Sequence, residues 1–304
     1  MAAIDTMTSP LKILPVWPGD SVGIVSPSHY LGEHQLKAGK DRLERLGYRA
    51  FFCQEPTLEA LPFAAKASRR ADALTLAFTH PEIRAILAAR GGGGALELLP
   101  LMNPELFHEN PKAFIGFSDA TAILLFLVHQ AGMVAFHGPT LSKHAEEGFA
   151  CTLAALNPGG FSREVRLMGP KYKVVIPGKA QGRVTGGCLS LVVSLLGTPF
   201  MPNLEGWMLF LEDIGEPSHR LYRMLVQLRL AGVFEKVSAV VFGPLGVSLD
   251  EPLVLQALKD LKIPVVMGIP SGHMPNMLPL PLGIRASLDT QEGVLRYLET
   301  PFLD

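Results

Sequence analysis

Residues 112–121 read Lys-Ala-Phe-Ile-Gly-Phe-Ser-Asp-Ala-Thr, an apolar strand pattern that passes directly into a helix pattern at Ser118. Gly116 lies two residues before this serine and Ala120 two residues after it, so both flanks of the corner are small. A nucleophile elbow requires such flanks, because the turn from strand to helix leaves no room for larger side chains. The start of the helix also offers free N–H groups to a developing oxyanion. The alternative interpretation is that Ser118 only caps the helix.

The chain on both sides of this corner alternates between strand and helix patterns. Strand patterns occupy residues 20–26, 48–52, 83–89 and 113–117, and helix patterns occupy residues 33–46, 64–78 and 119–130. Short connections between alternating strands and helices predict a parallel sheet covered by helices. A stretch rich in glycine and proline at residues 158–178 is interpreted as a linker, and a second α/β unit follows it. We therefore expect an N-terminal domain at residues 1–160 and a C-terminal domain at residues 161–304.

Composition excludes several classes of partner. The 304 residues carry 27 Lys and Arg against 28 Asp and Glu, a formal net charge of −1, so we expect neither nucleic acid nor an anionic membrane as partner. The longest apolar run, residues 120–128, has about half of the ~18 residues that a membrane-spanning helix needs. Three scattered cysteines favour a reducing compartment, and the start of the chain lacks a signal-peptide pattern. We expect a soluble, cytoplasmic protein.

Three further patterns contain residues suited to hydrolysis. Arg90 precedes four glycines, residues 91–94, whose N–H groups could bind an anion, although a flexible turn would have the same composition. A second-half strand pattern ends in Glu212 and Asp213, of which alternation lets only one face a site. A solvated strand end is the alternative. His273 lies in a loop rich in glycine and proline and is a candidate general base, or else a surface residue.

No pattern in the chain predicts a metal or another cofactor. The nine histidines show no H-x-x-x-H spacing and the three cysteines no C-x-x-C spacing. The glycine run fits neither the dinucleotide fingerprint nor the P-loop. The chemistry is therefore expected to rest on the chain's own side chains.

Taken together, these patterns resemble the LD-carboxypeptidases, a family of serine peptidases that also includes the microcin immunity peptidases. The resemblance extends over most of the chain, through residues 19–28, 90–94, 116–121, 136–139, 186–190, 197–199, 211–213, 222–225 and 272–273. It implies an N-terminal α/β domain with a parallel sheet, a C-terminal mixed α/β domain, and assembly as a homodimer.

The resemblance also assigns the site. It implies a catalytic triad with Ser118 as nucleophile, His273 as base and Glu212, rather than the acid that follows it, as the third member. Backbone N–H groups of Gly92 and Asp119 would form the oxyanion hole. The expected activity is that of a serine carboxypeptidase, which hydrolyses an LD-peptide bond and releases D-alanine from muropeptide tetrapeptides in cell-wall recycling. The alternatives are an immunity-type peptidase that cleaves a peptidyl- or aminoacyl-nucleotide, and a non-catalytic binding protein on the same fold.

The chain departs from the family pattern at two positions. Gly93 stands where the family commonly has an aromatic residue, and Cys188 stands where it has an asparagine.

Arg90 or Arg223 could hold the terminal carboxylate of a small peptide substrate. His137 is interpreted as a structural residue.

Overall fold

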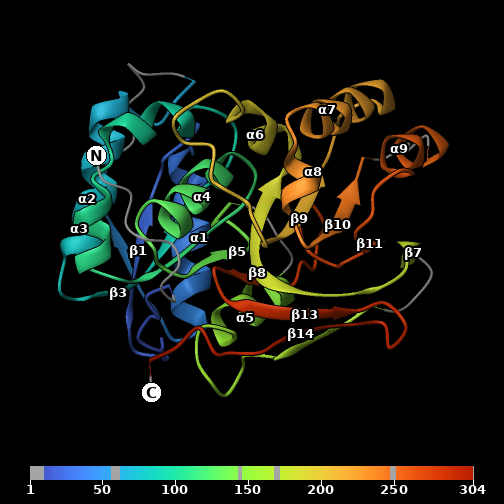
Figure 1. Ribbon diagram of the computed structural model, residues 1–304. Coiled ribbons are helices and arrows are strands. Elements are labelled where there is room, and N and C mark those ends of the chain that lie inside the picture. Colours follow the sequence, from blue (N-terminus) through green and yellow to red (C-terminus); the bar gives the residue numbers. More distant parts are fainter. Residues whose placement is uncertain (1–9, 56–61, 143–145, 168–171, 247–250, 304) are drawn as a thin grey trace.

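The computed structural model describes residues 10–55, 62–142, 146–167, 172–246 and 251–303. It contains two sheets, one built mainly from the blue-to-green first half of the chain and one from the yellow-to-red second half (Figure 1). The first sheet is mostly parallel and the second is mixed. The fold class predicted from the alternation of strands and helices, and from the family resemblance, is confirmed.

The first sheet has six strands in the order β12-β5-β4-β3-β1-β2. Its strands are β1 (Ser21–Val25), β2 (Arg49–Phe52), β3 (Ile83–Ala88), β4 (Ala113–Gly116), β5 (Ala135–His137) and β12 (Leu280–Leu282). All neighbours are parallel except β12, which pairs with β5 in the antiparallel direction. Because β3 and β4 are parallel neighbours, the segments that follow them leave the sheet at the same edge.

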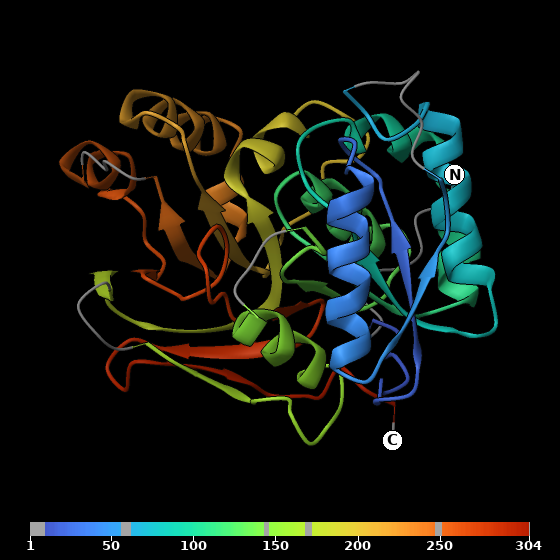
Figure 2. The ribbon, with the colours of Figure 1, turned by 180° about the vertical axis from the view of Figure 1, so that it is seen from behind.

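Helices cover both faces of the first sheet. They are α1 (Glu33–Arg45), α2 (Ala67–Thr79), η2 (Ala95–Leu101), α3 (Pro104–Glu109), η3 (Ser118–Ala120), α4 (Thr121–His129) and α5 (Glu146–Ala154). The view from behind shows α1 beside α5 (Figure 2), and an ion pair between Arg45 and Glu146 joins these two helices. All nine residues of α4 are buried, which explains an apolar run that is too short to span a membrane.

The second sheet has eight strands in the order β6-β14-β13-β8-β9-β10-β11-β7. Its strands are β6 (Glu164–Arg166), β7 (Lys173–Ile176), β8 (Lys179–Cys188), β9 (Met208–Asp213), β10 (Ala239–Leu245), β11 (Val265–Met267), β13 (Arg285–Asp289) and β14 (Val294–Tyr297). Strands β8 to β11 are parallel, and antiparallel pairs complete both sides. The helices of this half are α6 (Leu189–Ser194), α7 (Ser218–Leu230), α8 (Val233–Lys236) and α9 (Glu251–Leu258).

The two halves are joined where α4 packs against β8. The Cys188 N–H donates to Oγ1 of Thr121 at 3.1 Å. A Cβ on Gly187 would lie 2.6 Å from the same oxygen, so only glycine permits this approach. About two turns of helix further, His129 Nε2 lies 2.8 Å from Thr185 Oγ1, and burial lowers the pKa of this histidine to about 3. A neutral His129 therefore belongs to the contact between the halves.

Two details of the chain path differ from a simple succession of domains. The stretch interpreted as a linker, residues 158–178, contains the short strands β6 and β7, which lie at the two edges of the second sheet. Strand β12 lies in the first sheet although most of the second sheet precedes it in the chain. The division at residue 160 stays a prediction.

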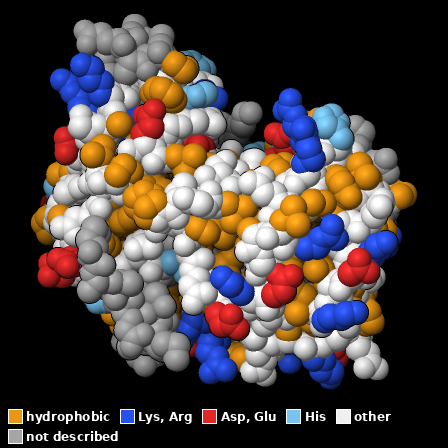
Figure 3. Space-filling model, turned by 45° about the horizontal axis from the view of Figure 1, so that its top comes forward, with side chains coloured by type: hydrophobic (Ala, Val, Ile, Leu, Met, Phe, Trp, Pro, Cys, Tyr) orange, Lys and Arg blue, Asp and Glu red, His pale blue; other side chains and the backbone are white. Residues whose placement is uncertain are grey.

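One face of the molecule carries charges of both signs. On the face shown in Figure 3, Lys and Arg side chains lie interspersed with Asp and Glu side chains, in keeping with the formal net charge of −1. Among the helices that the structure describes, none has the length and apolar character needed to cross a membrane.

Candidate active site

Ser118 occupies a strained corner between β4 and α4. Its φ is 58°, and it is the only residue other than glycine with a positive φ in the described part of the chain. A Cβ on Gly116 would lie 2.8 Å from the Cβ of Ala120, so the corner requires the small flanks read from the sequence. The N-cap of α4 is Ala120, not Ser118. The serine therefore has the geometry of a nucleophile elbow rather than that of a helix cap.

The glycine run after β3 lies against this corner. A Cβ on Gly91 would lie 2.9 Å from both Cβ and Oγ of Ser118, so the backbone of Gly91 packs on the serine side chain. Gly92 has a φ of +130°, and a Cβ there would overlap the ring of His29 at 2.5 Å. A side chain at either position would collide with a neighbour, so the run is more than a flexible turn. The oxyanion-hole role of the Gly92 and Asp119 amides stays a prediction.

The side chain of Asp119 joins the corner to its surroundings. It is 4 % exposed, and its Oδ2 accepts hydrogen bonds from Ser28 Oγ at 2.6 Å and from the Ala95 N–H at 2.9 Å. Ser28 follows β1, and Ala95 follows the glycine run. The carboxylate thus fixes the segments around Ser118. From the sequence, only the backbone N–H of Asp119 is expected to take part in the site. The hydrogen bonds of its side chain are not predicted.

Glu212 and His273 form a buried pair. Glu212 lies at the end of β9 and is fully buried, and its Oε2 accepts hydrogen bonds from His273 Nδ1 at 2.8 Å and from the His273 N–H at 3.0 Å. The adjacent Asp213 faces elsewhere and accepts a hydrogen bond from the Ser190 N–H at 2.8 Å, at the start of α6. The two acids therefore separate as strand alternation requires, and Glu212 is the one that reaches the histidine.

His273 lies beside the nucleophile corner. Its ring contacts that of Phe117, the residue before Ser118, with 4.7 Å between the ring centroids. The side chain of His273 is 19 % exposed. Because Nδ1 is bound to Glu212, Nε2 is the nitrogen left to exchange a proton with a hydroxyl or a substrate. The structure thus joins His273 to Glu212 and places its ring against the residue before Ser118, and the assignment of the three as a catalytic triad stays a prediction.

His137, interpreted from the sequence as structural, lies behind the pair. It is fully buried, and its Nε2 is 3.9 Å from Glu212 Oε1. Its ring also packs against Phe210 of β9, with 5.0 Å between centroids. The carboxylate therefore has a histidine on each side.

Cys188 is buried close to Glu212 but is not suited to act as a nucleophile. It pairs with Glu212 in the register of β8 and β9, and its Sγ lies 3.5 Å from Asp213 Oδ2. Burial, and then the neighbouring carboxylates, raise the pKa of its thiol, so it stays protonated.

The two candidate substrate arginines differ in their surroundings. Arg90 is partly buried next to the glycine run, and one of its guanidinium nitrogens donates to the carbonyl of Tyr30 at 3.1 Å. Arg223 lies exposed on α7. The structure places Arg90 close to the corner, and the role of both arginines stays a prediction.

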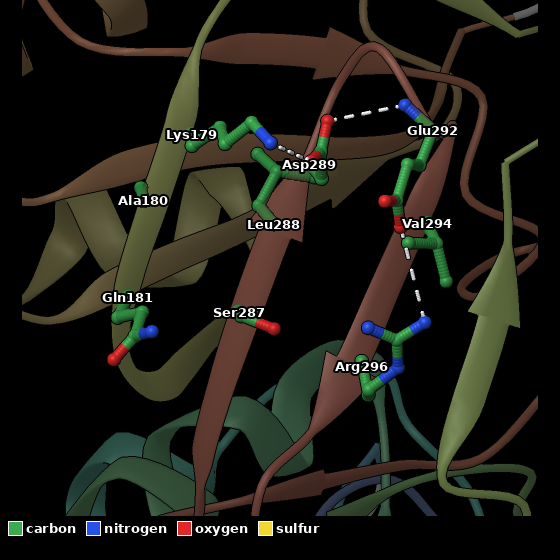
Figure 4. Close-up of a pocket in the computed structure, with 9 residues that line it drawn as sticks. All are labelled: Lys179, Ala180, Gln181, Ser287, Leu288, Asp289, Glu292, Val294 and Arg296. Carbon is green, nitrogen blue, oxygen red and sulfur yellow. Dashed lines mark hydrogen bonds and ion pairs between the residues drawn. The ribbon is translucent and has the colours of Figure 1, made fainter.

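A separate surface pocket of about 310 Å³ lies over β8, β13 and β14 (Figure 4). Its charges are paired with one another. Lys179 contacts Asp289 at 2.6 Å, and Arg296 contacts Glu292 at 3.9 Å and Glu164 at 2.8 Å.

Over the described ranges, no group of three or more His, Cys, Asp and Glu side chains is arranged to hold a metal ion.

Comparisons with known proteins match both halves of the chain. Residues 22–138 match the LD-carboxypeptidase N-terminal domain, and residues 181–288 match the LD-carboxypeptidase C-terminal domain. A putative carboxypeptidase of Streptomyces coelicolor is 33% identical over 94% of this chain and 95% of its own length. A probable murein peptide carboxypeptidase of Bacillus subtilis is 30% identical over 90% of each chain. The microcin C7 self-immunity protein MccF of Escherichia coli is 28% identical over 92% of this chain and 93% of its own.

Solved structures give the same picture. The muramoyltetrapeptide carboxypeptidase from Oxalobacter formigenes superposes with a TM-score of 0.79 at 28% identity, over 91% of this chain and 97% of that one. The wild-type apo form of MccF superposes with a TM-score of 0.86 at 25% identity, over 97% of this chain and 100% of that one.

Proposed function

This chain belongs to the LD-carboxypeptidase family, and from that premise we propose that it is a serine carboxypeptidase that hydrolyses an LD-peptide bond. The favoured substrate is a muropeptide tetrapeptide, from which it would release D-alanine in cell-wall recycling. One observation carries the proposal: the ring of Phe117, the residue before the strained Ser118, contacts that of a histidine whose Nδ1 is bound to a buried glutamate. A family relationship alone does not assign an activity, whereas a serine, a histidine and a buried acid near one corner are the groups that an acyl-transfer triad requires, and this supports the proposal.

In the proposed mechanism His273 moves one proton twice. Its Nε2 takes the proton from Ser118 Oγ while Oγ bonds to the carbonyl carbon and the C=O electron pair shifts to oxygen. The tetrahedral intermediate then breaks its C–N bond, and the same proton passes to the leaving amine of D-alanine. In the second half of the reaction a water molecule bonds to the acyl carbonyl carbon while His273 Nε2 takes its proton. The bond between that carbon and Ser118 Oγ then breaks, the proton passes to Oγ, and the shortened peptide leaves as a carboxylic acid. Glu212 keeps the ring in position and stabilises its charged form.

The oxyanion would be held by the backbone N–H groups of Gly92 and Asp119. Removing one donor of this kind typically costs about 2.7–4 kcal/mol of transition-state stabilisation. Arg90, which lies near the glycine run, is the better placed of the two arginines to bind the terminal carboxylate, and Arg223 is the second candidate. We further propose a small peptide as the only substrate class, a homodimer as the assembly, and the cytoplasm as the site of action.

The test is D-alanine release from a murein LD-tetrapeptide and from a DD-pentapeptide. We expect turnover of the LD-tetrapeptide alone, and a loss of roughly 10⁴–10⁶-fold in kcat/KM for S118A and H273A. Ser194→Ala and His34→Ala alter exposed residues of the same types and serve as matched controls. Near wild-type turnover by folded S118A or H273A would disprove the triad.

An immunity-type activity is the second candidate, because MccF matches almost the whole chain. A peptidyl-nucleotide offered beside the tetrapeptide distinguishes the two activities by the ratio of kcat/KM. A serine-directed phosphonate tests the non-catalytic alternative. Covalent labelling of Ser118 supports an enzyme, and a folded protein that does not label would favour a binding protein.

A further inference from the structure

Arg70 is a buried cation that the triad does not use. It lies in the first turn of α2, is 0 % exposed, and is among the largest fully buried side chains in the described residues. Its neighbour Arg69 is exposed. A guanidinium is rarely buried unless its donors are satisfied, because removing the charge from water is costly. The contacts of Arg70 therefore indicate what it holds in place.

The guanidinium of Arg70 binds three backbone carbonyls from separate segments. Nε donates to Ala65 O at 2.9 Å, and one terminal nitrogen donates to Gly94 O at 2.9 Å and also to Pro27 O. The other terminal nitrogen donates to Glu97 Oε2 at 2.7 Å. A lysine has no fork of donors that could reach these partners together.

Two of these carbonyls belong to the segments that Asp119 also holds. Pro27 immediately precedes Ser28, and Gly94 immediately precedes Ala95. The next residue in each case donates to the same Asp119 oxygen, Ser28 from its hydroxyl at 2.6 Å and Ala95 from its N–H at 2.9 Å. The end of the glycine run is thus fixed from both sides, by Arg70 and by the residue that follows the nucleophile.

The glycine run has no side chains of its own with which to hold its shape. Gly94 has a φ of +107°, and a Cβ there would lie 2.8 Å from the Arg70 nitrogen. Gly91, at the other end of the run, packs on Ser118. Donors of an oxyanion hole are effective only when they are fixed before the reaction. A residue that holds this run in place therefore contributes to stabilisation of the transition state.

We infer that Arg70 is a positioning residue that holds the glycine run in the geometry of an oxyanion hole. The inference rests on the proposed function. Arg70 touches no reacting atom in this scheme, so its loss is expected to lower the rate of chemistry more than substrate binding. Complete removal of one oxyanion donor costs about 10²–10³-fold in kcat, and a displaced donor should cost less.

The test compares Arg70→Met with Arg69→Met, an exposed arginine one position earlier on the same helix. We expect R70M to lower kcat about 10- to 100-fold with KM changed less than about threefold, and R70K to be intermediate. The pH limbs of kcat/KM should stay where they are, because the histidine–glutamate pair is intact. R69M should match wild type. A folded R70M with the kcat of R69M would overturn the inference.

A second readout does not depend on turnover. Hydrogen exchange of the peptide that covers residues 91–95 should become at least about tenfold faster in R70M and not in R69M, since opening of this run no longer breaks the Arg70 contacts. Unchanged exchange overturns the inference even if the protein turns out not to be a carboxypeptidase. Faster exchange in R70M, in a protein that does not release D-alanine, would support the role of Arg70 in holding the glycine run and would reject the proposed function.

Glu97→Gln keeps the inference testable if R70M does not fold. The Glu97 side chain is 52% exposed, so this variant weakens one guanidinium contact without opening the core. It should lower kcat about two- to fivefold and speed exchange at residues 91–95. An E97Q protein that equals wild type in both measurements would overturn the inference.

Discussion

Replacing Gly272 with alanine should break the hydrogen bond between Glu212 and His273 while leaving both residues in the chain. Gly272 precedes His273 and has a φ of +114°, and a Cβ there would lie 2.5 Å from Oε2, 2.6 Å from Cγ and 2.7 Å from Cδ of Glu212. Carbon atoms in contact are normally about 3.5–4.0 Å apart, so the glutamate must retreat by about 1 Å. A 2.8 Å hydrogen bond lengthened by that amount is lost.

The magnitude follows from two separate costs. Positive φ in alanine costs about 1–3 kcal/mol of unfolding free energy, and overpacking of the buried carboxylate costs about another 1–3 kcal/mol. A misplacement of about 1 Å in a catalytic group typically lowers activity about 10²-fold, and complete loss of the acid's orienting role about 10⁴-fold. We therefore expect G272A to lose about 10²–10⁴-fold in kcat/KM.

Gly197 provides the matched control, since its φ is +78° and a Cβ there would meet no atom within 4 Å. Gly197→Ala should share the backbone strain, lose about 1–2 kcal/mol of unfolding free energy and keep its activity. Denaturant unfolding and D-alanine release, measured on both variants, separate strain from collision. Equal kcat/KM in G272A and G197A would refute the reasoning, because strain would then be the only effect of the substitution.

Three further predictions concern strain, burial and titration. Ser118→Gly should raise the free energy of unfolding by about 1 kcal/mol relative to S118A, because glycine adopts a positive φ without strain. Thermal or denaturant unfolding of the two variants tests this. Equal stability would show that the corner is unstrained. Burial lowers the pKa of His129 to about 3, below its ordinary value of about 6.5, so the unfolded chain binds a proton that the folded chain refuses. The contribution of neutral His129 to stability should be complete above about pH 6.5 and fall by about 1.4 kcal/mol per pH unit as the pH drops toward 3. The difference in unfolding free energy between wild type and His129→Gln should therefore shrink between these two pH values. A difference that stays constant would contradict the prediction. Burial raises the pKa of Cys53 to about 12 and that of Cys188 as well, whereas Cys151 is exposed, so a disulfide reagent at pH 8 should modify Cys151 alone until the protein unfolds; rapid modification of C151S would be the contrary result.

Local patterns in the sequence predicted the tight corner at Ser118, although they left a helix cap as the alternative interpretation. The small residues at positions 116 and 120 reflect a collision within five residues of chain, and such short-range sterics leave a mark in the sequence. The choice of Glu212 over Asp213 also has a local part, because alternation separates the two acids. The prediction that Glu212, and not Asp213, is the partner of His273 rested on the family resemblance.

Contacts between distant segments could not be predicted in this way. Nothing in the sequence marks Arg70 as different from Arg69, since both are arginines at the start of a helix pattern, and charged residues are usually exposed. The hydrogen bonds of the Asp119 side chain and the pairing of β12 with β5 likewise join residues far apart in the chain. Their positions follow from how the sheets and loops pack, which periodicity does not report.

The place of β12 has a consequence for how such enzymes can be recombined. His273 lies in the connection between β11, in the second sheet, and β12, at the edge of the first. His273, the proposed base, therefore lies on a connection that begins in one half and ends in the other. A chimera that joins the first 160 residues of one family member to the rest of another would import a foreign edge strand into its first sheet together with the foreign histidine. The two halves are thus not interchangeable modules, and the edge contact with β5 must be kept compatible in any exchange.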